Sequence, residues 1–148
     1  MEKQELMAHE VIAKVFQIKN EIENRPVSDW AIDSLVDYIF TLTKLMYNLS
    51  DLRLDLILAS DIAEEDYKSK LRQHYLELKG GEVKMTEVEA KARSEEACSP
   101  LKRDEIQARY NARLVSDLYR DSERLINFTQ TKIKSMTNEI VRSKMERK

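Results

Sequence analysis

The sequence predicts an all-α fold, and three observations lead to that prediction. Only two glycines and two prolines occur among the 148 residues, so turns must be few and the elements between them long. Hydrophobic residues make up 42% and charged residues 35% of the chain, which is typical of long helices that share their apolar faces. Apolar residues also recur at helical spacing along most of the chain. We therefore expect one domain, residues 1–148, built as an elongated antiparallel helical bundle with a long coiled-coil-like C-terminal helix, and we expect it to form oligomers.

The first predicted helix covers about residues 4–24. Its buried face is indicated by apolar residues at i, i+4, i+7 and i+11, which are Val11, Val15, Ile18 and Ile22. The helix should end at Arg25-Pro26, because the residue before a proline is pushed out of the α region.

The most apolar part of the chain follows Ser28, which we expect to be a helix N-cap. Its stripe of Leu, Ile, Phe and Met is wide enough to need more than one partner helix, so we expect it to form the core of the bundle. We predict two helices here, over about 29–58 and 61–79, with a restart at Ser60-Asp61. Neither glycine nor proline occurs at that point, so one continuous helix is the alternative.

Gly80-Gly81 is the strongest helix breaker in the sequence, and we expect a glycine in the left-handed conformation to end the preceding helix there. Thr86 and Glu89 then match a capping box, in which a threonine is followed three residues later by a glutamate. This box predicts a short helix over about 87–97. That helix has few apolar side chains for a core.

The last predicted helix covers about 100–145. Ser99 stands at its N-cap and Pro100 at its first helical position, where proline is favoured. Its apolar positions recur at roughly 3.5 to 4 residues, with charges on both sides, as in a coiled-coil-like helix. We expect this helix to pack against the segment from 29 to 78.

The sequence predicts neither an enzyme nor a metal or cofactor site. His9 and His74 are the only histidines, and neither has cysteine, histidine or paired carboxylates at ligand spacing, so we expect both to be exposed. The single cysteine, Cys98, excludes an intramolecular disulfide and fits a reducing compartment, and we expect a partly buried, unreactive thiol. No glycine-rich phosphate loop is present.

No run of 18 or more apolar residues occurs, so no membrane span is predicted, and the first ten residues lack the hydrophobic segment of a secretory signal. We therefore expect a cytoplasmic protein. The net charge of −2 hides an asymmetry: residues 1–66 carry 14 acidic and 6 basic side chains, whereas residues 67–148 carry 13 acidic and 19 basic ones. Such a chain can bind a polyanion at its basic end or use both ends for contacts between subunits.

Basic side chains are concentrated on both sides of the glycine pair. The candidates for binding nucleic acid are Lys68, Lys70, Arg72, Lys84, Lys91 and Arg93. Tyr67 and Tyr75 lie near them, and a single-stranded nucleic acid groove requires such cations and aromatic rings for phosphate neutralisation and base stacking. We expect the cations to converge if the chain folds back at the glycines. The alternative is a solvated helix face whose charge is balanced by neighbouring glutamates.

The order of these features resembles the UvsY-type recombination mediator proteins of tailed bacteriophages. Those proteins have an N-terminal helical part, a central helix rich in lysine and arginine, a break marked by glycine, and a C-terminal helix used for assembly. The segments of this chain that match are LRLDLILASDIAEEDYKSKLRQHYLELKGG, KMTEVEAKARSEE and ARYNARLVSDLYRDSERLINFTQTKIKSM. The resemblance covers about residues 45–136.

The resemblance implies a non-enzymatic oligomer that binds single-stranded DNA and helps a strand-exchange recombinase to displace the single-strand binding protein. It implies that the six candidate cations contact DNA. It also implies subunit contacts by six apolar residues of the last helix, which are Leu114, Leu118, Leu125, Phe128, Ile133 and Met136. The competing class is a helical protein-binding inhibitor or adaptor, or a structural coiled-coil subunit, that does not bind nucleic acid.

Overall fold

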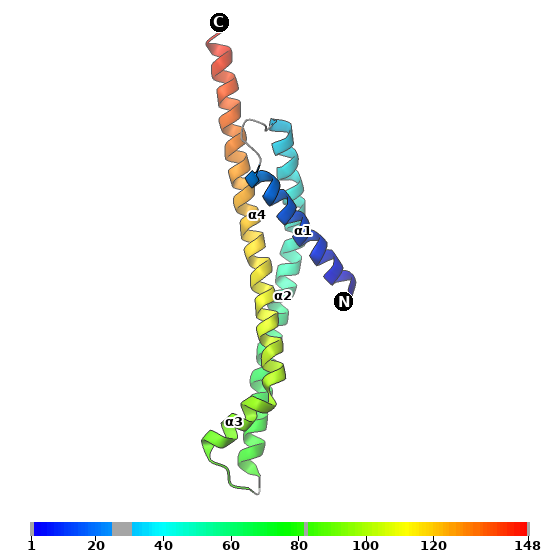
Figure 1. The fold of residues 1–148 in the computed structure, drawn as a ribbon, viewed down its shortest axis with the longest axis vertical. Coiled ribbons are helices and arrows are strands. Elements are labelled where there is room, and N and C mark those ends of the chain that lie inside the picture. The colour runs from blue at the N-terminus through cyan, green and yellow to red at the C-terminus, as the bar shows by residue number, and fades with distance from the viewer. Residues whose placement is uncertain (1, 25–30, 82, 148) are drawn as a thin grey trace. The chain divides into compact units, whose positions relative to one another are not determined.

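The computed structural model describes residues 2–24, 31–81 and 83–147, and within these ranges it contains four helices and no strand (Figure 1). The helices are α1 (Glu2–Asn24), α2 (Ile32–Gly80), α3 (Glu87–Ala97) and α4 (Ser99–Met145). The predicted all-α class is confirmed. Of the described helices, none combines the length and the apolar composition needed to cross a membrane.

The chain forms two compact units. Unit 1 comprises Met1–Leu52 and Val115–Lys148, and unit 2 comprises Arg53–Leu114. The helices α2 and α4 each contribute one part to each unit, whereas α1 belongs to unit 1 and α3 belongs to unit 2.

Three of the predicted helices agree with the structure to within two residues at either end, and these are α1, α3 and α4. The capping box of α3 is confirmed, because the Thr86 side chain accepts a hydrogen bond from the backbone N–H of Glu89 and the Glu89 carboxylate accepts one from the backbone N–H of Thr86. The helix start predicted at Ser28 lies outside the described residues.

The predicted division of the second segment into two helices was wrong. α2 is a single helix of 49 residues that passes through Ser60-Asp61 without interruption. The physical reason is that serine and aspartate only weaken a helix interior, whereas no glycine or proline occurs before the glycine pair to stop the backbone hydrogen-bond ladder.

The glycine pair ends α2, but not in the way that the sequence suggested. No described glycine has a positive φ, so the predicted left-handed cap is wrong. The helix ends at Gly80, where the low helix propensity of two successive glycines is sufficient to stop it. The returning loop is held by Lys79, whose Nζ donates a hydrogen bond to the Met85 carbonyl oxygen over 3.4 Å.

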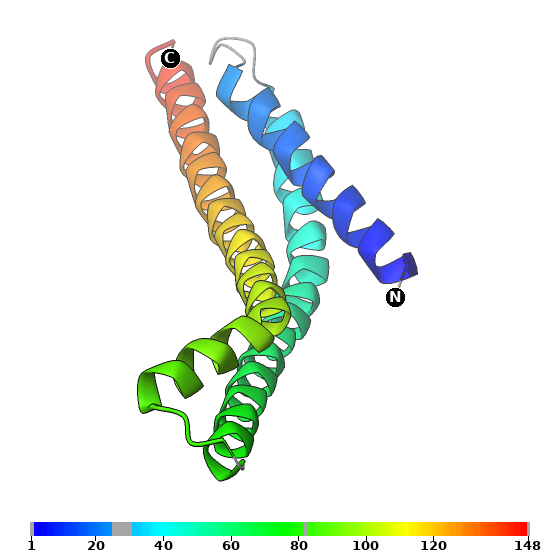
Figure 2. The same ribbon diagram turned by 60° about the horizontal axis from the view of Figure 1, so that its bottom comes forward.

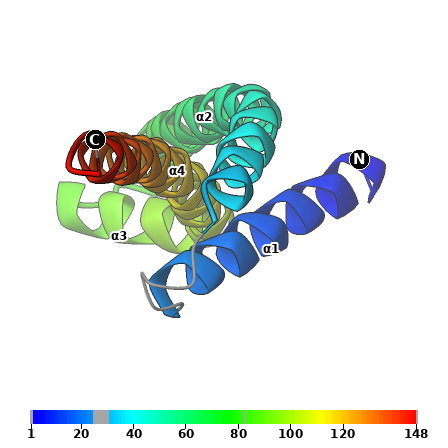
Figure 3. The ribbon, with the colours of Figure 1, turned by 90° about the horizontal axis from the view of Figure 1, so that it is seen from above.

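The core of unit 1 is a seam with a seven-residue repeat. Buried leucines at this spacing on α2 are Leu35, Leu42 and Leu49. α4 contributes buried residues at the same spacing, which are Val115, Ser122 and Thr129. α1 lies beside the N-terminal part of α2 (Figure 3). It adds the buried residues Val15 and Ile18, and Ile18 belongs to the same apolar cluster as Leu35 and Leu42.

Two hydroxyl groups are buried in this seam without losing their hydrogen bonds. Ser122 Oγ donates to the Leu118 carbonyl oxygen over 2.8 Å, and Thr129 Oγ1 donates to the Leu125 carbonyl oxygen over 2.7 Å. Each hydroxyl is therefore satisfied within its own helix and leaves no unpaired polar group in the core. Small side chains of α4 thus share the seam with large leucines of α2.

Unit 2 is packed differently. Its buried residues, within the described part of the chain, are Ala90, Ser94, Cys98, Glu105 and Ala112. None of them is a large aliphatic or aromatic side chain. Figure 2 shows α3 joining α4 at a sharp corner, and that corner is a single residue, Cys98, whose carbonyl oxygen already accepts the first backbone hydrogen bond of α4 from the Lys102 N–H.

Candidate nucleic-acid interface

The C-terminal part of α2 places three of its cations on one face. Lys68, Arg72 and Lys79 are separated by four and seven residues, which brings them onto the same side of a helix with about 100° per residue. All three are exposed. Tyr75 lies on the same side between Arg72 and Lys79 and is half-buried. This set, which we call the basic face, contains two of the six predicted cations, Lys68 and Arg72, together with Lys79, which was not among them.

Lys68 is partly neutralised by its neighbours. Its Nζ lies 2.6 Å from a Glu64 carboxylate oxygen and 3.9 Å from one of Glu65. The hydrogen bond and the attraction between Lys68 and Glu64 raise the pKa of Lys68 above its usual value and lower the pKa of Glu64 below its own. The pair is exposed, so water screens it and a phosphate group can compete for the lysine.

Lys70 does not lie on the basic face. It is two residues from Lys68, which places it about 160° away around the helix. There its Nζ donates a hydrogen bond to Gln73 Oε1 over 3.3 Å, and Gln73 in turn donates to Glu77 over 2.9 Å. Lys70 is therefore separate from the row that contains Lys68 and Arg72, as its spacing from them indicates.

The cations beyond the glycines are exposed but are not gathered into one group. Lys84 lies in the loop before α3. Lys91 and Arg93 lie on opposite sides of the buried Ala90–Ser94 edge of α3, because they are two residues apart on a helix. α3 also carries four glutamates, so its net charge is negative. Lys91 and Arg93 therefore lie among the glutamates of α3, whereas Lys84 lies outside that helix.

The aromatic and histidine side chains near the basic face are less accessible than we expected. The ring of Tyr67 is covered by Lys102 of α4, whose Nζ lies 4.7 Å from the ring centroid in a cation–π contact. His74 is half-buried and its Nδ1 is buried without a hydrogen-bond partner, so the expectation of an exposed His74 is wrong. The side chain of His9 lies outside the described residues. Tyr75 remains as the aromatic ring of the basic face.

The most unusual buried group is Glu105 of α4, which sequence reasoning missed. Its side chain is 1% exposed and lies between two cations of the same helix. Lys102 Nζ is 2.7 Å from Oε2, and the Arg109 guanidinium contacts Oε1. Neither oxygen has a well-oriented hydrogen bond, so the contacts are ionic in character. No sequence signal marked it, because the seven-residue spacing of Cys98, Glu105 and Ala112 becomes meaningful only once the structure shows that all three are buried.

Most of the apolar residues predicted to join subunits are used inside unit 1. Leu118 is buried, and three others pack against the cluster of Ile18, Leu35 and Leu42: Leu125, Ile133 and Met136. Only Leu114 and Phe128 of the predicted set are exposed, at 38% and 58%. Part of the apolar surface of these four side chains is therefore used within the chain, and their role in subunit contacts stays a prediction.

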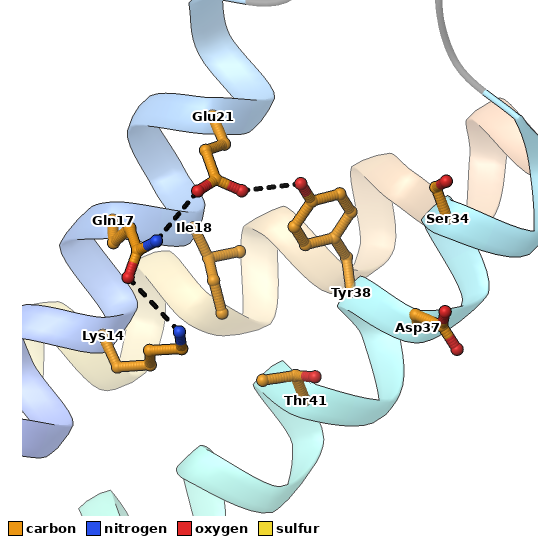
Figure 4. A pocket seen from close by; sticks show the side chains of 8 residues that line it. All are labelled: Lys14, Gln17, Ile18, Glu21, Ser34, Asp37, Tyr38 and Thr41. Carbon is orange, nitrogen blue, oxygen red and sulfur yellow. Dashed lines mark hydrogen bonds between the residues drawn. The ribbon is translucent and has the colours of Figure 1, made fainter.

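Unit 1 also contains a polar cavity of about 290 Å³ between α1 and α2 (Figure 4). One wall is a chain of hydrogen bonds, in which Lys14 donates to Gln17, Gln17 donates to Glu21, and the Tyr38 hydroxyl donates to Glu21 over 2.6 Å. The rest of the lining consists of Ile18, Ser34, Asp37 and Thr41. The two carboxylates are exposed, and no group of three metal-ligating side chains occurs among the described residues.

Comparison with protein-family models, with curated proteins and with solved structures finds no match for this chain.

Proposed function

We propose that this protein binds single-stranded nucleic acid, without catalysing a reaction, through the basic face of α2. The observation that carries the proposal is the alignment of Lys68, Arg72 and Lys79 along one exposed helix face. Residues 67–86 carry five basic and two acidic side chains, so the region is locally positive although the whole chain is not. Counterion release from a phosphate backbone favours binding to such a row of cations.

A single strand fits this face better than a duplex does. A flexible strand follows a straight row of cations, whereas a duplex requires a wide positive surface or an element that enters a groove. Tyr75 offers part of its ring for stacking with one base. Lys84, in the loop that follows α2, extends the positive region.

The more specific role rests on the resemblance to recombination mediators. In that role the protein assembles into oligomers, binds single-stranded DNA in the cytoplasm, and helps a recombinase to displace the single-strand binding protein. The seven-residue repeat of buried positions on α2 and α4 supports a coiled-coil-like packing of these helices. A chain of net charge −2 is expected to bind DNA weakly as a single copy. Several copies assembled on one strand would bind it more tightly, because their individual affinities combine through multivalency.

The test is binding of a fluorescent oligothymidylate measured by anisotropy at several salt concentrations. Replacing Lys68, Arg72 and Lys79 together by alanine should weaken binding at low salt by at least about tenfold, and should lower the salt slope by up to ~0.7 for each phosphate that the variant no longer neutralises. The matched control replaces Lys70, Lys91 and Arg93 together by alanine, which removes the same number of exposed cations at positions off the basic face. Absence of binding at low salt, or an equal loss in the control, would contradict the proposal.

A second candidate function, a helical module that binds proteins only, is favoured by a different observation. Many large apolar side chains of the described residues are exposed, among them Leu58, Val83 and Val88 at 60%, 69% and 79%. Exposed apolar rows of this kind serve contacts between proteins. This candidate predicts that the protein does not bind the oligonucleotide at any salt concentration, so the same anisotropy measurement separates the two.

A further inference from the structure

The two long helices of unit 2 each expose a straight row of three large apolar side chains. The α2 row consists of Leu54, Leu58 and Ile62. The α4 row consists of Ile106, Tyr110 and Leu114. Their side chains are between 38% and 63% exposed. Both rows have i, i+4, i+8 spacing, so each covers about two turns on one side of its helix.

Charges of opposite sign flank the two rows. The acidic residues beside the α2 row are Asp55, Asp61 and Glu65, and the basic residues beside the α4 row are Arg103, Arg109 and Arg113. All six side chains are exposed. Within the described part of the chain, Asp55, Asp61, Arg103 and Arg113 form no ion pair. The exposed apolar rows of unit 2 are therefore flanked by charged side chains, four of which have no ion-pair partner among the described residues.

One chain cannot bring its own two rows together. In unit 2 the two helices run side by side in opposite directions (Figure 2), and Tyr67 of α2 contacts Lys102 of α4. Leu58 is nine residues from Tyr67, so it lies half a turn away from this contact. Tyr110 is two residues from the buried Ala112, so it lies about 160° away from the buried side of α4. Both rows point outward.

The two rows nevertheless lie at the same height along the helix pair. Leu58 precedes Tyr67 by nine residues, and Asn111 follows Lys102 by nine, so in an antiparallel pair with equal rise these two positions are level. Asn111 lies within the α4 row. The flanking charges can be counted in the same way. Each acidic residue beside the α2 row then lies at the height of an arginine beside the α4 row, to within one residue. The three pairs are Asp55 with Arg113, Asp61 with Arg109, and Glu65 with Arg103.

We propose that the α2 row of one copy packs against the α4 row of a second copy. The contact is head to tail, because it joins two different surfaces, and it needs no shift along the helices. Repetition of such a contact gives a closed ring or an open chain, not a symmetric dimer. The alternative pairings of two like rows would place acid against acid or arginine against arginine. This interface does not depend on nucleic acid binding.

The interface is small, about two turns on each side, and is below the roughly 1,200 Å² of a stable complex. Association should therefore depend on concentration and weaken in high salt. The wild-type chain is measured by sedimentation velocity over a wide range of concentrations, together with Leu58→Glu and Tyr110→Glu. Each substitution blocks one row, so each variant alone should be monomeric, but an equimolar mixture should form a one-to-one dimer and nothing larger.

The matched control is Leu76→Glu, which changes an equally exposed apolar residue of α2 outside both rows and should leave association unchanged. Far-UV circular dichroism checks that each variant stays helical. As a second route, Asp55→Arg and Arg113→Glu should each shift half-association to about tenfold higher concentration, and the double variant should restore it. A wild-type monomer at every concentration, a mixture that stays monomeric, or a loss caused by only one of the two row variants would overturn the proposal.

Discussion

Units 1 and 2 share the same two long helices but bury different kinds of side chain. Unit 1 buries Val15, Ile18 and a repeat of leucines, with its two core hydroxyls satisfied inside α4. Among the described residues, unit 2 buries fully only two alanines, a serine, a cysteine and a glutamate. Its large apolar side chains are partly buried, as Leu71, Leu78 and Leu101 are, or more than half exposed, as Leu58 and Val83 are. Hydrophobic burial therefore contributes more to the stability of unit 1, whereas ion pairs, a helix cap and, by our proposal, a second copy have a larger share in unit 2.

The largest expected effect concerns the core of unit 1. Leu42 is fully buried in the apolar cluster, so Leu42→Ala should lower the free energy of unfolding by about 2–5 kcal/mol, through reduced burial and the cavity left behind. Denaturant unfolding followed by circular dichroism measures this change. Phe40→Ala on the same helix is the control, because Phe40 is 72% exposed and should cost little. Equal effects at the two positions would remove the contrast between core and surface in unit 1.

The next effect tests whether unit 2 depends on charge. Glu105→Ala should lower the free energy of unfolding by about 1–3 kcal/mol, because Lys102 and Arg109 lose the anion between them. Their side chains are about half exposed and keep part of their hydration, so the loss should be less than for a fully buried pair.

Glu105→Leu is the informative companion variant, since it replaces the charge by apolar surface of similar size. If unit 2 needs the ion pairs, the leucine variant should also be destabilised. A leucine variant as stable as the wild type would show that filled space matters there and the charge does not.

The helix cap of unit 2 should give a smaller effect. Thr86→Ala removes the side chain that accepts from the Glu89 N–H, and it should destabilise α3 by about 1 kcal/mol. Hydrogen exchange of the α3 amides measures the change locally. The amides of α1 serve as the internal control, and faster exchange in both helices would mean that the cap acts on the whole chain and not on α3.

The smallest effect is a dependence of unit 2 on pH. The hydrogen bonds and the charge of Lys68 lower the pKa of Glu64 below its usual value of 4.5. The resulting stabilisation is present above pH 4.5 and is lost as the pH falls through the lower, folded value. Lys68 has a pKa above its usual 10.5, so its share is present below that pH and is lost as the pH rises through the folded value. An NMR titration of the Glu64 carboxyl, repeated in Lys68→Met, should show a pKa that is less lowered in the variant, where only the weaker attraction of Arg109 and Lys102 remains.

Much of the fold followed from local signals that are strong by themselves. The capping box at Thr86 and the proline at position 100 each depend on a few neighbouring residues, and each predicted the start of the correct helix. Positions without a clear helix breaker were harder to predict. Ser60-Asp61 has helix-weakening residues but no glycine or proline, so the sequence allowed both a restart and a continuous helix, and the structure shows the continuous one.

The candidate site was less predictable than the helices, because it depends on which side of a helix each residue takes. Lys68 and Lys70 are neighbours in the sequence but lie on opposite sides of α2. Tyr67 was expected to offer its ring to a base, but Lys102 from a distant part of the chain covers it. Glu105 resembles any solvated glutamate in the sequence, and only the tertiary structure shows its burial.

The single-residue corner at Cys98 provides a natural reporter of opening. The thiol is the only one in the chain, it is unpaired, and it is 5% exposed, so a thiol reagent can reach it only when α3 swings away from its neighbours or unit 2 unfolds. At high reagent concentration the modification rate equals the opening rate, and at low concentration it gives the opening equilibrium. The unmodified protein can thus report how often this corner opens, with and without a bound oligonucleotide.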